Sequence, residues 1–158
     1  MMYAKGLGTE QDPKQALKYY EEAISMLRKV GDRGIEGITL SNLSGLYSKL
    51  GKKEQARTYY EEALKIFKDV GDRWEEGRTL YTLGKLYFNQ EYYEVALSCF
   101  LVARGILEEV QNPDRGRTQR WIDNLRNNVG DERFATLLAE VEPKASEIVE
   151  KALQEGLS

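Results

Sequence analysis

Apolar residues recur every three or four positions along most of this chain, which is the spacing of an amphipathic helix. One stripe in residues 40–50 contains Leu40, Leu43, Leu46, Tyr47 and Leu50. A second stripe covers residues 56–70. Gly51 and Gly71 stand where the stripes end, and glycine readily takes the left-handed conformation that closes a helix. Asp72 then stands where a cap of the next helix is needed. The pattern predicts two long antiparallel helices between residues 31 and 70.

The same pattern is written again forty residues later. The segment VGDRGIEGITLSNLSGLY (30–47) aligns without a gap with VGDRWEEGRTLYTLGKLY (70–87). Ala56, Ala63 and Ile66 recur as Ala96, Ala103 and Ile106. A fixed period of this size is typical of a solenoid, in which each unit buries its apolar face against its neighbours. We therefore predict an all-α fold, an α-solenoid of antiparallel helical hairpins.

Weaker copies extend the repeat in both directions within one array spanning 1–158. Residues 19–23 (YYEEA) match residues 59–63, which predicts a partial hairpin at 1–30 whose first helix is nearly missing. We expect either a truncated first repeat or a piece of a longer protein. After the regular repeats 31–70 and 71–110, residues 116–118 echo residues 77–79 and predict a degenerate hairpin at 115–142. Pro143 opens a last helix, 143–155, which we expect to cap the open end.

The composition of the chain argues against several classes of function. No apolar run approaches the roughly 20 residues needed to span a bilayer, so we expect no membrane contact. Cys99 is the single cysteine, which favours a reducing, cytoplasmic location. The net charge of −3 argues against a nucleic-acid protein. Histidine, the commonest general base and metal ligand, is absent. We therefore expect no catalytic residue, no metal and no cofactor, and a chain that is not an enzyme.

Two stretches carry a family resemblance. Leu40-x2-Leu43-Ser44-x2-Tyr47 followed by Ala56-x3-Tyr60 resembles the tetratricopeptide pattern. Leu80-x2-Leu83-Gly84-x2-Tyr87 followed by Ala96-x3-Phe100 is more similar still. The forty-residue unit resembles the long-repeat branch found in kinesin light chains, spindle-orientation scaffolds and bacterial regulatory proteins. The resemblance implies a protein–protein adaptor that holds a partner segment in a concave groove lined by the first helix of each hairpin, and a C-terminal capping helix.

The groove residues follow from that resemblance, on the helix side away from the Leu/Tyr stripe. They are Ser41, Asn42, Gly45, Lys49, Arg78, Thr82, Lys85, Asn89, Arg117, Arg120, Asn124 and Asn127. This set contains lysines and arginines but no carboxylate. Arginine forks suit carboxylates, and asparagine can pair with an extended backbone. We predict that the ligand is an extended peptide, acidic or C-terminal.

Other constellations have a structural and a functional interpretation. The pairs Tyr19-Tyr20, Tyr59-Tyr60 and Tyr92-Tyr93 could stack on bases, but core packing is favoured because no basic stripe accompanies them. The pairs Glu21-Glu22, Glu61-Glu62 and Glu75-Glu76 are predicted to lie on a solvated outer face. Trp74 is equally consistent with an interface anchor and with packing on the next hairpin. Trp121 is expected to wall the groove's end, and Cys99 to be buried.

A second function belongs to a different class. The chain opens inside a hairpin, so the exposed face of helix 13–30 would lack its partner. The alternative is therefore a self-assembling or regulatory segment of a larger signalling protein, which stacks end-to-end through its open N-terminal end to form a homo-oligomer.

Overall fold

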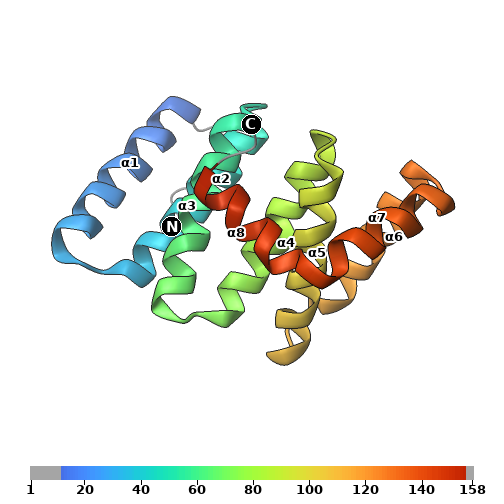
Figure 1. Cartoon of the computed structure of the whole chain (residues 1–158). Coiled ribbons are helices and arrows are strands. Elements are labelled where there is room, and N and C mark those ends of the chain that lie inside the picture. The colour runs from blue at the N-terminus through green and yellow to red at the C-terminus, as the bar shows by residue number, and fades with distance from the viewer. Residues whose placement is uncertain (1–11, 156–158) are drawn as a thin grey trace. The chain divides into compact units, whose positions relative to one another are not determined.

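A computed structural model describes residues 12–155 (Figure 1). The elements in this range are α1 (Pro13–Val30), α2 (Arg33–Lys49), α3 (Lys53–Val70), α4 (Arg73–Asn89), α5 (Tyr93–Glu109), α6 (Arg115–Val129), α7 (Asp131–Val141), the 3-10 turn η3 (Glu142–Lys144) and α8 (Ala145–Glu155). No strand occurs among these residues, so the all-α prediction is confirmed. The chain divides into two compact units between Ile66 and Phe67, which are described separately.

The junctions between helices repeat as the sequence indicates. Gly31 and Gly71 have φ angles of 79° and 75°, and each follows the last residue of a helix. The Oδ1 atom of Asp32 accepts a hydrogen bond from the backbone N–H of Ile35 at 3.2 Å. The Oδ1 atom of Asp72 accepts one from the backbone N–H of Glu75 at 3.0 Å. These bonds satisfy donors that the first turn of a helix leaves open. The predicted caps at the second junction are therefore confirmed.

Two later turns keep the same geometry without glycine. Glu91 has a φ of 65° where the preceding repeat has Gly51, and Gln111 has a φ of 54° where it has Gly71. A left-handed conformation costs a residue with a Cβ about 1–2 kcal/mol. The second repeat therefore carries local backbone strain that the first repeat avoids.

Unit 1 contains α1, α2 and most of α3. Helix α1 packs on α2, and Ile24, Leu40 and Leu43 are almost fully buried. Helices α2 and α3 meet through the stacked rings of Tyr47 and Tyr59, whose centroids are 5.5 Å apart. Residues 1–11 of the predicted partial hairpin lie outside the described residues.

Unit 2 depends on a close approach of α4 to α5. A Cβ on Gly84 would lie 2.6 Å from the Phe100 ring, and one on Gly77 would lie 2.7 Å from Leu107. Real Cβ atoms do not come this close to another heavy atom, so only glycine permits this spacing. Leu80, Leu83 and Ala96 fill the same interface and are almost completely buried.

The predicted role of the last helix as the cap of the array stays a prediction. Helix α8 begins at Ala145, two residues after the predicted start at Pro143, and packs on α5 (Figure 1). The reason lies in α5, whose outer face carries Val95, Leu101, Val102 and Gly105 where α3 has Gln55, Glu61, Glu62 and Lys65. A helix that is apolar on all sides must be covered on all sides. Helix α8 covers this face with its apolar stripe, Ala145, Val149, Ala152 and Leu153.

The spacing of α4 and α5 can be tested by adding one methyl group. We expect Gly84→Ala to lower the free energy of unfolding by about 1–2 kcal/mol, because overpacking against Phe100 outweighs the gain in helix propensity. Gly105→Ala is the matched control, since no atom lies within 4 Å of its would-be Cβ. That control should raise stability by about 0.5–1 kcal/mol. Urea unfolding measures both, and equal effects would contradict the close approach.

Docking of α8 can be tested in the same unit. Val149 is 4% exposed, so Val149→Asp places an unpaired charge against α5 and should cost about 2–4 kcal/mol of docking free energy. Hydrogen exchange of the amides in residues 145–155 should accelerate strongly. Ser146→Asp, at an exposed position on the same helix, should leave exchange unchanged. Undiminished protection in Val149→Asp would show that α5 does not hold this helix.

Candidate functional site

Within unit 2, α4 and α6 bring two of the predicted groove residues together around one carboxylate. Asp114, just before α6, lies 3.5 Å from the Arg117 guanidinium and 3.9 Å from that of Arg78 on α4. Arg78 also lies 3.4 Å from Glu75, one turn earlier on α4. The two arginines are exposed, and these are surface ion pairs of modest strength.

The expectation of a cationic face without carboxylates therefore needs correction. Glu75 and Asp114 lie beside the arginines and match much of their charge. Neither carboxylate belongs to the predicted set, because each precedes its arginine by three residues and only the helical turn brings the pair together. A ligand carboxylate would have to compete with both acids for Arg78 and Arg117.

Lys85 differs from these arginines. Its ammonium lies 4.7 Å above the centre of the Tyr81 ring and 6.0 Å from that of Trp121. The structure gives it no ion pair or hydrogen bond to any residue in 12–155. Burial lowers the pKa of Lys85, the nearby Arg117 charge lowers it further, and Asp114 opposes the shift. Lys85 is thus a half-buried cation whose three N–H donors have no protein acceptor.

Aromatic rings surround the end of this face. The Trp121 ring lies 5.5 Å from that of Phe88 and 6.2 Å from that of Phe100. The Tyr93 ring lies 5.7 Å from Phe88, and its hydroxyl donates to Asn128 at 3.3 Å. Trp121 is half-buried, so part of its surface remains open beside Lys85. The predicted role of Trp121 as the groove's end wall stays a prediction.

The remaining predicted residues of unit 2 are polar surface positions. The Thr82 hydroxyl donates back to the carbonyl of Arg78 at 3.1 Å, which satisfies it within its own helix. Asn89, Arg120, Asn124 and Asn127 are exposed. Only Lys85 in the predicted set combines partial burial with an unpaired charge in this unit.

In unit 1 the predicted residues of α2 separate into two groups. Asn42 and Lys49 are exposed and two turns apart on the helix. Ser41 is half-buried, and its hydroxyl oxygen is shielded from solvent without a hydrogen-bond partner. Gly45 was expected on the groove face, but a Cβ there would lie 3.6 Å from the Tyr60 hydroxyl of α3. The groove role of all four residues stays a prediction, and Asn42 and Lys49 are the two that are exposed.

Two buried glutamates were not predicted. Glu36 and Glu76 occupy the same position in the two repeats and are 2% and 6% exposed. The Arg28 Nε of α1 donates to Glu36 at 2.9 Å, while Arg73 lies 3.2 Å from Glu76. The solvated outer face expected for Glu76 is therefore wrong. Its recurrence at a shift of forty, beside the invariant Gly37/Gly77 pair of this chain, was the available signal.

Both arginines of these buried pairs bridge to a second carboxylate. Arg28 donates to Glu62 of α3 at 2.6 Å, and Arg73 donates to Glu109 of α5 at 2.8 Å. The hydrogen bond from Arg73 lowers the pKa of Glu109, and the bond to Glu36 raises that of Arg28. Each guanidinium thus ties together helices of one unit. We assign these pairs to packing, since Arg28 joins α1 to α2 and α3, and Arg73 joins α4 to α5.

The burial of the tyrosine pairs also differs from the prediction. Tyr19 and Tyr92 are 50% and 39% exposed, and Tyr20, Tyr59, Tyr60 and Tyr93 are half-buried. The core interpretation is therefore wrong for Tyr19 and Tyr92, whereas Tyr59 packs on Tyr47 and Tyr93 packs on Phe88. Cys99 is buried as predicted. Trp74 is 44% exposed, which leaves its two interpretations open.

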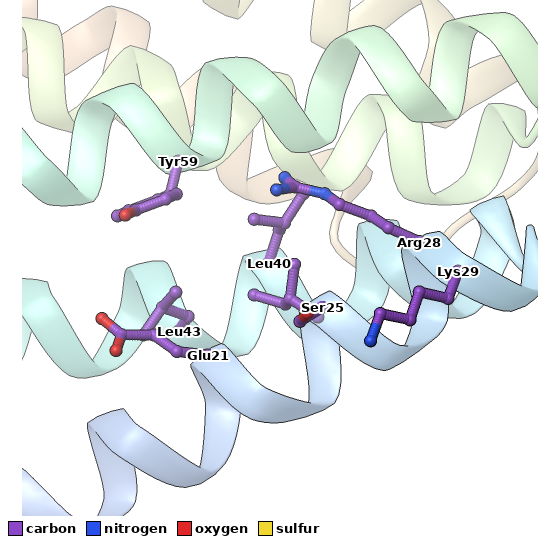
Figure 2. Close-up of a pocket in the computed structure, with 8 residues that line it drawn as sticks. Glu21, Ser25, Arg28, Lys29, Leu40, Leu43 and Tyr59 are labelled. Atoms are coloured by element: carbon purple, nitrogen blue, oxygen red, sulfur yellow. The ribbon is translucent and has the colours of Figure 1, made fainter.

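Unit 1 also contains a cavity of about 480 Å³ between α1, α2 and α3 (Figure 2). Figure 2 shows Glu21 at one end and Arg28 with Lys29 at the other. Ile24, Leu40 and Leu43 line its floor but are nearly inaccessible. Because Arg28 is already held by two carboxylates, this cavity offers little to a ligand.

Antiparallel helical hairpins that repeat along the chain define a helical-repeat protein. A model of the tetratricopeptide repeat family matches residues 3–69, which supports assigning the chain to that family. Tetratricopeptide repeats mediate protein–protein interaction, and their fold is typically non-catalytic. No curated protein matches the chain.

No helix in residues 12–155 has the length and apolarity to cross a membrane. No cluster of three or more metal-ligating side chains occurs in the same range.

The environment of Lys85 predicts how its ammonium group titrates. With 13C-labelled lysine side chains, the Lys85 signal, identified by its loss in Lys85→Met, should titrate below the ordinary value of 10.5. The folded chain then holds this proton less tightly than the unfolded chain, so the charged form costs stability at neutral pH. That cost disappears as the pH rises from the folded pKa to the ordinary value. A pKa at or above the ordinary lysine value would contradict the burial of this ammonium.

Proposed function

We propose that the chain is an adaptor whose α4–α6 face captures an extended segment of another protein, acidic or ending in a free carboxylate. The observation that carries the proposal is Lys85, a half-buried ammonium without an acceptor among residues 12–155. A desolvated cation is a stronger partner for an incoming anion than a solvated one, because its water has already been removed.

The surroundings of Lys85 support a ligand of mixed character. A ligand carboxylate would accept from Lys85, with Arg117 close enough to influence the same charge. An apolar side chain of the ligand would lie on the open part of Trp121. Asn124 and Arg120, exposed on α6, would hydrogen-bond the ligand backbone. In unit 1 the proposal includes only the exposed Asn42 and Lys49 of α2, which are considered separately from the face of unit 2.

The expected affinity is micromolar. A short helical face buries an area near the low end of the roughly 1,200–2,000 Å² of stable interfaces. Ordering an extended peptide also costs free energy that a folded partner would not lose. Such an interface suits reversible capture.

The proposal can be tested by removing one charge. A library of random displayed peptides with free carboxyl ends is selected on the wild-type chain, and the best peptide is measured by isothermal titration. We expect acidic sequences to be enriched and Lys85→Met to weaken the best peptide at least about tenfold. Methionine keeps the stem that packs on Tyr81 while removing the ammonium.

The control removes the same charge elsewhere. Lys151→Met, on an exposed position of α8, should bind the peptide as the wild type does. Reversing Arg78 and Arg117 is a less clear test, because glutamates there would face Glu75 and Asp114 and loosen the helices themselves. Equal binding by Lys85→Met and Lys151→Met would discard the proposed face.

A further inference from the structure

Lys85 differs in its surroundings from every other lysine that the structure describes. The other lysines in residues 12–155 are exposed, whereas Lys85 is half-buried. Its ammonium lies 4.7 Å from the centre of the Tyr81 ring and 6.0 Å from that of Trp121, and no oxygen atom of the described residues accepts from it. The rings attract the charge, but they do not replace the hydrogen bonds that water gives to an exposed ammonium.

The charges around Lys85 favour the neutral amine. Burial lowers the pKa of Lys85, Arg117 of α6 lowers it further, and Asp114 opposes the shift. Desolvation and a neighbouring cation are the two conditions that turn a lysine side chain into a nucleophile. Lys85 meets both conditions while part of its surface remains open to solvent.

Arg117 also provides a place for an anionic reagent. Its guanidinium is exposed, and one nitrogen lies 3.5 Å from Asp114. No ion pair or hydrogen bond to the other guanidinium nitrogens occurs among the described residues. Arginine binds phosphate oxygens well through its planar fork of N–H groups. A small acyl phosphate held there would bring its carbonyl carbon close to Lys85.

We propose that Lys85 is an acylation site, which takes a small acyl group from a reagent of the acyl phosphate class. The ammonium first releases one proton to water. The lone pair of the amine then forms a bond to the carbonyl carbon, and the bond from that carbon to the phosphate oxygen breaks. The second proton of the amine goes to the released phosphate. The product is a neutral amide, which can remain against the rings of Tyr81 and Trp121.

Acylation of Lys85 would prevent ligand capture by the α4–α6 face. The modification removes the charge that a ligand carboxylate would meet, and it leaves one N–H donor where there were three. This regulatory consequence rests on the proposed function. The reactivity of Lys85 does not, because it depends only on the surroundings of the amine.

The test measures how fast each lysine reacts. The folded chain is incubated with acetyl phosphate near neutral pH and then unfolded, and every remaining amine is labelled with deuterated acetic anhydride. Mass spectrometry gives the ratio of light to heavy acetyl groups at each lysine. We expect Lys85 to react at least about threefold faster than the exposed Lys144 and Lys151, because the neutral fraction grows tenfold for each unit by which the pKa falls. The same reaction in concentrated urea should remove the difference.

Two arginine variants test the surroundings of the amine. Arg117→Gln removes both the neighbouring charge and the phosphate partner, so it should slow acetylation of Lys85 by about threefold or more. Arg133→Gln, at an exposed position of α7, removes the same charge elsewhere and should leave the rate unchanged. Circular dichroism checks that both variants remain helical.

Two results would overturn the proposal. The first is a Lys85 rate no higher than that of Lys151. The second is an advantage of Lys85 that survives in urea, since the local sequence and not the fold would then be its cause.

Binding separates this proposal from the proposed function. The selected peptide is titrated into chains that carry acetyl-lysine, incorporated during translation, at Lys85 or at Lys151. Acetylation of Lys85 should weaken binding at least about tenfold, and acetylation of Lys151 should not change it. Fast acetylation of Lys85 together with unchanged peptide binding would discard the peptide face and leave the acylation site standing.

Discussion

The close approach of α4 to α5 at Gly84 and Gly77 determines the arrangement of unit 2. A helix that lies this near its partner can bury Leu80 and Leu83 completely, so the opposite face of α4 remains polar and faces outward. Arg78 and Lys85 stand on that outer part and meet the residues of α6. A larger residue at either glycine would widen the hairpin and shift those side chains together with the helix that carries them.

The cations of the α4–α6 face differ in whether a carboxylate lies beside them. Arg78 and Arg117 form ion pairs with carboxylates, while Lys85 lies against aromatic rings, forms no ion pair with residues 12–155 and has a lowered pKa. The three cations look alike in the sequence. They differ in how much water and how many acceptors surround them, and this difference decides which of them can contribute most to an incoming anion.

The local features were readable from the sequence because they depend on residues close together. Helix ends at Gly71 and the cap at Asp72 follow from a few neighbouring positions, and the repeat gave the hairpins. The position of α8 depends on contacts between distant segments, although the apolar Leu101 and Val102 in place of Glu61 and Glu62 were a visible signal. The burial of Glu76 had only its recurrence at a shift of forty as a signal, and the pairing of Asp114 with Arg78 required the geometry itself.

The apolar outer face of α5 also limits how the repeat array can be extended by duplication of a hairpin. Hairpin α2–α3 has a charged outer face and could be copied in tandem without exposing apolar surface. A tandem copy of hairpin α4–α5 would present a second set of Val95, Leu101 and Val102 with no second α8 to cover it. Gene duplication at this point would therefore expose apolar surface and favour aggregation.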